Sequence, residues 1–274
     1  MEATLLKGKD KRVTIKDYSI CYDDLGNSDT PIIFIHGFPF DKSSWQPQMD
    51  FLESTHRVIS YDIRGYGKST PGKETPGIRL FADDLINFMD QLEITNAIIC
   101  GLSMGGYIAL NAVTRFPEKF KAIILSDTQC IADSPETKVK RQNSISQVTS
   151  GGSREFIEGL INNLFCKETL QQNQTLVDKI RTIMLTTNAA TITGSLNALA
   201  QREDMCSSLT DIQVPALIIC GKEDVLTPPA KSEQLQINID NSTLRIIDKA
   251  GHLSNLEQPD QFNKHLNEFI LSLN

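Results

Sequence analysis

Residues 101–105 carry the pattern Gly-x-Ser-x-Gly, in which Ser103 stands between two glycines. A short apolar run at 97–100 precedes the pattern and is typical of a buried strand, and an apolar helical pattern follows at 107–116. Because a sharp strand-to-helix turn leaves no room for side chains, Gly101 and Gly105 relieve the crowding. This context predicts that Ser103 is held at a tight corner with its hydroxyl exposed as a nucleophile.

A serine hydroxyl is a weak nucleophile and needs a base that takes its proton. The chain has four histidines. His252 lies in the loop after the last predicted strand and, by position, is the best candidate base. We expect His36, which follows an earlier strand, to hold its loop by bonding the backbone. We expect His56 and His265 to lie at the surface.

The base in turn needs an acid that orients it, and two aspartates follow predicted strands. Asp224 gives the chain order Ser, Asp, His, which serine hydrolases built on parallel sheets use. Asp127 is the competitor for this role. If Asp224 is the acid, Asp127 is free to line the pocket or to bond the neighbouring backbone.

Two backbone N–H groups could stabilise a developing oxyanion. Met104 directly follows the serine and opens the predicted helix, whose N-terminus carries free N–H groups and a positive dipole end. The second donor should come from the loop His36-Gly37-Phe38-Pro39, and we assign it to Phe38.

Strand-like and helical patterns alternate along most of the chain, which favours a parallel sheet with helices on both faces. A hairpin at 12–15 and 18–23 leads into predicted strands at 31–35, 57–61, 97–100, 121–125, 215–220 and 243–247. The segment 131–210, here called the cap, lacks strand-like runs. It is predicted to form helices at 136–148, 153–164, 175–186 and 189–200. The core would then comprise 1–130 and 211–274, with the candidate loops at the carboxyl ends of its strands.

Composition narrows the function classes. The 274 residues are 40% hydrophobic and 22% charged, which is ordinary for a globular protein. The net charge of −7, without a Lys/Arg cluster, argues against nucleic acid or anionic membrane as the main partner. The chain contains no apolar run of about 18 residues that would span a membrane.

The sequence also indicates no cofactor and no metal. No Gly-x-Gly-x-x-Gly opens a helix after the first predicted strand, and the Gly-rich loop 62–69 lacks phosphate-loop spacing. We interpret that loop as structural, with a polar network around Asp62 and Arg64. No cluster of His, Cys, Asp and Glu has metal-ligand spacing.

Six cysteines are present, and none belongs to a Cys-x-x-Cys pair. Several lie in apolar runs, so we expect all of them to be reduced and mostly buried. The N-terminal residues lack a long apolar run, so we expect no signal peptide. Together these features predict a cytoplasmic protein.

The sequence resembles the α/β-hydrolase superfamily over nearly its whole length, and most closely the branch of 3-oxoadipate enol-lactonases and small carboxylesterases. Five motifs in the expected order carry the resemblance: His36-Gly37-Phe38-Pro39, Asp62–Ser69, Gly101–Gly106, Gly221–Asp224 with Thr227-Pro228-Pro229, and Ala250–Leu253 with Glu257-Gln258-Pro259. The resemblance implies a mostly parallel eight-stranded sheet with helices on both faces and a helical cap insertion.

By this resemblance, Ser103 attacks the carbonyl of a small-molecule ester or lactone, His252 acts as the base and Asp224 orients it. The cap would cover the pocket and select the substrate. Arg202 in the cap is either a contact for a substrate carboxylate or a solvated charge at a helix end. The other predicted substrate contacts are Gly37, Trp45, Asp127 and Leu253.

Other functions use the same residues. Hydrolysis of a carbon–carbon bond in a diketone and cofactor-free perhydrolysis would share the Ser–His–Asp triad. Epoxide and haloalkane hydrolases are disfavoured because their nucleophile is normally an aspartate. A ligand receptor on a hydrolase scaffold is a further alternative. The sequence leaves open the natural substrate, the pathway and whether the protein is a homodimer.

Overall fold

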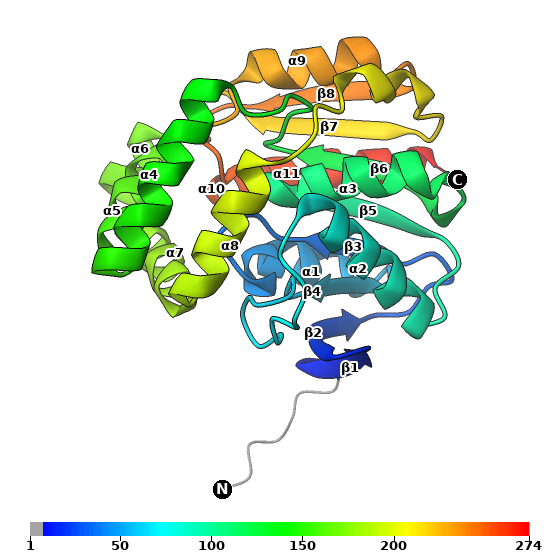
Figure 1. Ribbon diagram of the computed structural model, residues 1–274. Helices are drawn as coiled ribbons and strands as arrows, with labels where there is room; N and C mark the ends of the chain where they lie inside the picture. Colours follow the sequence, from blue (N-terminus) through cyan, green and yellow to red (C-terminus); the bar gives the residue numbers. More distant parts are fainter. Residues whose placement is uncertain (1–7, 274) are drawn as a thin grey trace, which may run out of the picture.

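A computed structural model describes residues 8–273 of the chain. The expectation about a signal peptide concerns residues that lie mostly outside this range. One eight-stranded sheet runs through the molecule in the order β1-β2-β4-β3-β5-β6-β7-β8 (Figure 1). The β1–β2 and β2–β4 pairs are antiparallel and all other pairs are parallel. The strands are β1 (Lys11–Ile15), β2 (Tyr18–Leu25), β3 (Ile32–Ile35), β4 (Val58–Tyr61), β5 (Ala97–Leu102), β6 (Phe120–Ser126), β7 (Ala216–Gly221) and β8 (Ser242–Ile247).

The central strands are buried on both faces, and this burial accounts for their apolar sequences. Every residue of β3, β5 and β7 is buried, which explains why these segments appear as continuous apolar runs without alternation. From β3 the chain crosses first to β4 on one side and then to β5 on the other. This reversal opens a crevice beyond the carboxyl ends of β3 and β5, the place where ligands bind in such sheets.

Helices flank both faces of the sheet (Figure 1). Helices α2 and α3 pack against each other, and α1 packs against α11. The core helices are α1 (Gln46–Leu52), α2 (Ile78–Gln91), α3 (Met104–Arg115), α9 (Pro229–Asn238), α10 (Ser254–Glu257) and α11 (Pro259–Ser272). Short 3-10 turns form at Lys42–Trp45, Pro117–Lys119 and Cys206–Asp211.

The cap consists of five helices that gather at the carboxyl ends of the parallel strands (Figure 1). They are α4 (Pro135–Gly151), α5 (Arg154–Leu164), α6 (Lys167–Gln172), α7 (Gln174–Thr186) and α8 (Ala189–Ala200). The short α6 was not predicted, because six residues carry too little periodicity to reveal a helix. The boundaries of core and cap as separate domains stay a prediction.

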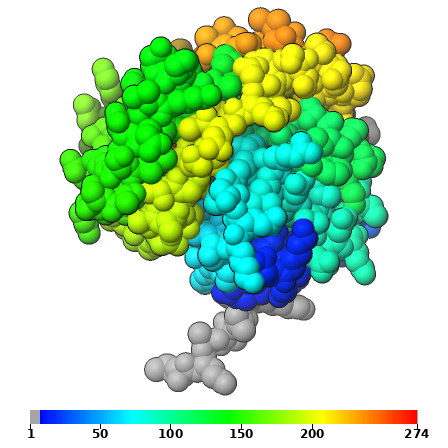
Figure 2. All heavy atoms as spheres, in the orientation of Figure 1, coloured from blue at the N-terminus to red at the C-terminus, as the bar shows by residue number. Residues whose placement is uncertain are grey.

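Helix α8 ties the cap to the core. Thr191 Oγ1 donates to the Gly65 carbonyl at 2.9 Å, and the Tyr66 hydroxyl donates to Ser195 Oγ at 2.6 Å. In Figure 2 the cap, coloured green to yellow, forms one side of the molecule, and α8 lies against core residues coloured cyan. The Gly-rich loop 62–69 therefore supports the cap by bonding to α8.

The structure corrects the prediction that all cysteines are reduced. Cys130 and Cys206 form a disulfide, while Cys21, Cys100, Cys166 and Cys220 are free and buried. The bonded residues are 76 positions apart and lie at the two ends of the cap. The disulfide therefore joins these two ends, which we call the neck of the cap. Sequence spacing misses such a pair, because only the fold brings the two ends of an insertion together.

Candidate active site

Ser103 occupies the turn between β5 and α3. Its backbone has φ 52° and ψ −109°, a strained conformation for a residue with a side chain. A Cβ on Gly101 would lie 2.3 Å from the Gly105 carbonyl oxygen, and a Cβ on Gly105 would lie 2.3 Å from that of Ile35. Glycine is therefore required on both sides, as predicted, and the half-buried serine faces a cavity.

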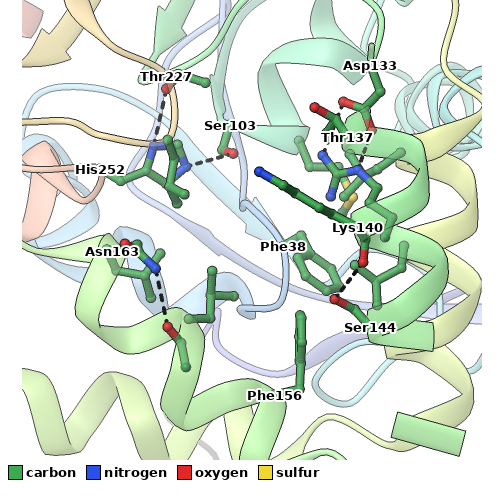
Figure 3. Close-up of a pocket in the computed structure, with 18 of the residues that line it drawn as sticks. Phe38, Ser103, Asp133, Thr137, Lys140, Ser144, Phe156, Asn163, Thr227 and His252 are labelled. Carbon is green, nitrogen blue, oxygen red and sulfur yellow. Dashed lines mark hydrogen bonds and ion pairs between the residues drawn. The ribbon is translucent and has the colours of Figure 1, made fainter. Parts of the chain in front are cut away.

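Hydrogen bonds join Ser103, His252 and Asp224 in a chain. His252 Nε2 lies 2.9 Å from Ser103 Oγ (Figure 3). On the other side of the ring, His252 Nδ1 lies 2.7 Å from Asp224 Oδ2. The three residues come from the loops after β5, β8 and β7, which are far apart in sequence. The parallel sheet brings them to one edge. The structure thus assembles the three residues that the sequence singled out.

The acid in this chain is held by several donors. Asp224 Oδ1 accepts from the backbone N–H groups of Leu226 at 2.8 Å and Thr227 at 3.0 Å, and Oδ2 accepts from Thr227 Oγ1 at 2.7 Å. Burial acts to raise the pKa of Asp224, but the charge of His252 and these hydrogen bonds outweigh it and lower the pKa. Asp224 is therefore a fixed carboxylate.

The contact between His252 and Asp224 also shifts the pKa of His252. Burial acts to lower the pKa of its ring, but the charge of Asp224 and the hydrogen bond to it outweigh burial and raise the pKa. A more basic imidazole is a better acceptor for the serine proton. The Nδ1 contact with a carboxylate also favours the tautomer that leaves Nε2 free to accept.

Phe38 and Met104 border the cavity next to Ser103. Among residues 8–273, neither backbone N–H donates a hydrogen bond to another residue. Gly37 lies behind the serine, because a Cβ on it would meet Ser103 Cβ at 3.3 Å. The arrangement leaves two free donors beside the nucleophile, as an oxyanion site needs.

The other histidines take no part in this chain. His36 is fully buried: its Nε2 accepts from the Ile63 N–H at 3.0 Å and its Nδ1 lies 2.9 Å from the Gly37 carbonyl oxygen. Burial lowers the pKa of His36 to about 4, so it stays neutral and holds the loop that carries Phe38. His56 and His265 are partly exposed and lie outside the cavity.

A cavity of about 1150 Å³ lies between core and cap. The core contributes Phe38, Ser103 and His252, and the cap contributes Phe156 from α5 and Lys140 from α4. The rings of Phe38 and Phe156 lie 6.1 Å apart between centroids. In Figure 3 the Lys140 ammonium points into the cavity toward Ser103. These cap residues were missed because only their helical register, combined with the fold, directs them inward.

Four predicted substrate contacts do not border the cavity. Gly37, Trp45, Asp127 and Leu253 are buried and do not line it. Trp45 packs into the core against Phe34, with 5.0 Å between ring centroids. Asp127 accepts from the Gly221 N–H at 2.8 Å and from Ser254 Oγ at 2.6 Å, so it bonds neighbouring loops.

Arg202 lines the cavity, but most of its donors already bond other residues of the chain. Its Nη1 lies 2.6 Å from Asp133 Oδ1, its Nη2 donates to the Ile131 carbonyl at 2.9 Å, and its guanidinium lies 4.5 Å from the Tyr107 ring centroid. With 7% exposure it is not a solvated charge either. Arg202 therefore links the two ends of the cap by bonding to Ile131 and Asp133.

The described residues offer no group of three or more His, Cys, Asp or Glu side chains that could hold a metal ion. No helix between residues 8 and 273 is long and apolar enough to cross a membrane.

A family model for the alpha/beta hydrolase fold matches residues 30–259. The chain belongs to the α/β-hydrolase family. Among curated relatives, this α/β-hydrolase is 29% identical over 258 residues to 3-oxoadipate enol-lactonase 2 of Acinetobacter baylyi, with 92% of each chain covered. The predicted fold and family are thereby confirmed.

Two solved structures resemble the fold over almost its full length. A thermophilic esterase from Thermogutta terrifontis has a TM-score of 0.92 and 29% identity, covering 96% of this chain and 99% of its own. The enol-lactonase from Burkholderia xenovorans LB400 has a TM-score of 0.89 and 26% identity, covering 95% and 100%. The relatives of this α/β-hydrolase thus include proteins that act on esters and on lactones.

Proposed function

We propose that this α/β-hydrolase cleaves a carboxylic ester or lactone of a small molecule through an acyl-enzyme on Ser103. The observation that carries the proposal is the hydrogen-bonded chain from Ser103 through His252 to Asp224. The esterase and enol-lactonase among its relatives support the choice of substrate class.

In the first half of the reaction, Ser103 Oγ attacks the carbonyl carbon while His252 Nε2 takes the serine proton. The charge on the carbonyl oxygen develops between the N–H groups of Phe38 and Met104. When the tetrahedral intermediate collapses, the alkoxide leaves with the proton from His252. For a lactone, the leaving hydroxyl stays attached to the acyl group.

In the second half, His252 removes a proton from water and the resulting hydroxide attacks the acyl-enzyme. Collapse of the second tetrahedral intermediate breaks the bond to Ser103 Oγ, which recovers its proton from His252. Asp224 remains ionised throughout and stabilises the imidazolium that forms twice per turnover.

The test is hydrolysis of a panel of short p-nitrophenyl esters and an enol-lactone by wild type, Ser103→Ala and Ser150→Ala. Ser150 is an exposed serine of α4 and serves as the matched control. We expect turnover by wild type and by Ser150→Ala, and background rates for Ser103→Ala. Equal activity of Ser103→Ala and wild type would refute the proposal.

A further inference from the structure

Glu257 is a buried carboxylate that the reaction above does not use. It ends the short helix α10, five residues after His252. Its Oε1 accepts from the Gly251 N–H at 2.7 Å, and its Oε2 accepts from the Cys166 N–H at 2.8 Å. One side chain therefore bridges the loop that carries His252 and the junction between cap helices α5 and α6.

The same loop and junction are also joined by one bond between their backbones and one from the Cys166 side chain. The His252 N–H donates to the Leu164 carbonyl at 2.8 Å, and Cys166 Sγ lies 3.3 Å from the carbonyl oxygen of Lys249. A Cβ on Gly251 would lie 2.7 Å from the Cys166 nitrogen, so the two backbones are in contact. Shifting the junction would leave several buried polar groups without partners, which is costly.

The residues just before this junction face the substrate cavity. Leu160, Asn163 and Leu164 of α5 line it together with His252. Figure 3 shows Asn163 and His252 on the same side of the cavity. A molecule in the cavity therefore contacts the same cap segment that is bonded to the His252 loop.

We propose that Glu257 is a positioning residue through which residues 164–166 of the cap hold the His252 ring against Ser103. The inference rests on the proposed function, since it assigns to the cap a part in placing the base. Position matters because a displacement of about 1 Å in a reacting group can lower a rate about 100-fold.

The sharpest test compares two variants that differ by one N–H and leave the backbone where it is. Cys166 has φ −66°, and Phe165 before it has φ −115° and ψ 154°, so proline fits at position 166. Cys166→Pro deletes the donor to Glu257. Proline also removes the sulfur that caps α6 and contacts the Lys249 carbonyl, so the matched control is Cys166→Ala, which loses the same sulfur but keeps the N–H donor.

A second pair of variants tests the carboxylate itself. Glu257→Gln retains the shape but can accept only one of the two N–H groups, because its amide nitrogen then faces the other donor. Glu168→Gln is the control. Glu168 pairs with Lys249 at 3.2 Å across the same junction, but both side chains are largely exposed.

We expect Cys166→Pro and Glu257→Gln to lower kcat about tenfold or more for a p-nitrophenyl ester, with KM within about twofold of wild type. In Cys166→Pro, which keeps the charge of Glu257, the acidic limb of the pH profile of kcat/KM should move to lower pH as the contact between His252 and Asp224 loosens. In Glu257→Gln that limb also moves because the variant removes a charge that raises the pKa of His252. A purely structural role would lower the folded fraction, measured by circular dichroism, without moving that limb.

The inference is overturned if Cys166→Pro equals Cys166→Ala in kcat and pH profile. Should the proline variant not fold, equality of Glu257→Gln and Glu168→Gln overturns it in the same way. An inactive wild type that a serine-reactive phosphonate also leaves unlabelled would instead refute the proposed function, and the inference with it.

Discussion

At the scale of single residues, the candidate site depends on how buried acids are partnered. Asp224 receives three hydrogen bonds from residues 226 and 227 in addition to its contact with His252, and so stays ionised. Asp127 is fully buried nearby, and burial together with the charge of Asp224 raises its pKa to about 7. Two aspartates that follow neighbouring strands thus have opposite tendencies to ionise, because their surroundings differ.

The raised pKa of His252 sets the expected pH dependence. The ring must be neutral to accept the Ser103 proton, so kcat/KM should fall as pH decreases through a pKa above the ordinary value of about 6.5. Asp224→Asn should lower kcat about 10³–10⁴-fold, because the amide no longer stabilises the imidazolium or fixes its tautomer. Asp248→Asn, at an exposed surface pair with Lys222, is the control. A rate that stays constant from pH 5 to pH 8 would contradict this role of His252.

The raised pKa of Asp127 predicts a stability effect whose sign can be derived. Between the unfolded pKa of about 3.8 and the folded pKa of about 7, the unfolded chain is ionised and the folded one is protonated. Wild type therefore loses free energy of unfolding as pH rises through this window. Asp127→Asn cannot ionise, and its amide can still pair with Gly221 and Ser254. Its stability relative to wild type should rise by about 2 kcal/mol between pH 5 and pH 8.

Urea unfolding of both proteins at the two pH values measures this difference. A stability difference between Asp127→Asn and wild type that does not change with pH would show that Asp127 is ionised throughout.

At the scale of elements, the strand-to-helix turn at Ser103 shows what could be predicted locally. The apolar runs of β3, β5 and β7 and the glycines beside Ser103 are local signals, and the structure agrees with each. The partners of the residues in the loop after β4 were harder to predict from the sequence. Arg64 pairs with Asp84 of α2 at 2.5 Å, whereas Asp62 accepts from the Lys42 and Lys68 N–H groups. The predicted network around Asp62 and Arg64 is therefore two separate sets of contacts.

Gly105→Ala tests how tight the strand-to-helix turn is. The added Cβ would lie 2.3 Å from the backbone oxygen of Ile35, so β3 and α3 must move apart. We expect a loss of about 2–4 kcal/mol in the free energy of unfolding and a large loss of activity. Gly151→Ala at the end of α4 meets nothing within 4 Å and should be neutral or slightly stabilising. Urea unfolding distinguishes the two, and equal stability would mean that the turn tolerates a Cβ.

At the scale of the whole molecule, long-range pairings set the limit of sequence reasoning. Ser103, Asp224 and His252 were found because each follows a strand, and parallel strands end at one edge. The commitment of Arg202 to Asp133 and the burial of Trp45 between Phe34 and Phe262 depend on residues far along the chain. No local pattern identifies such partners.

The disulfide at the neck of the cap is a further long-range pairing. Because it closes a long loop, reducing it should lower the free energy of unfolding by about 2–4 kcal/mol. The measurement is urea unfolding with and without dithiothreitol. Alkylation after denaturation, followed by intact mass, should count four thiols without reductant and six with it. Six thiols in the unreduced protein would contradict the disulfide.

The most direct measurement of the central claim is covalent labelling with a fluorophosphonate, followed by peptide mass spectrometry. A fluorophosphonate reacts with a serine only when a neighbouring base activates the hydroxyl. We predict one adduct, on Ser103, that is absent from Ser103→Ala and strongly slowed in His252→Ala. An adduct on another residue, or a folded wild type that is never labelled, would contradict the assignment of Ser103 as an activated nucleophile.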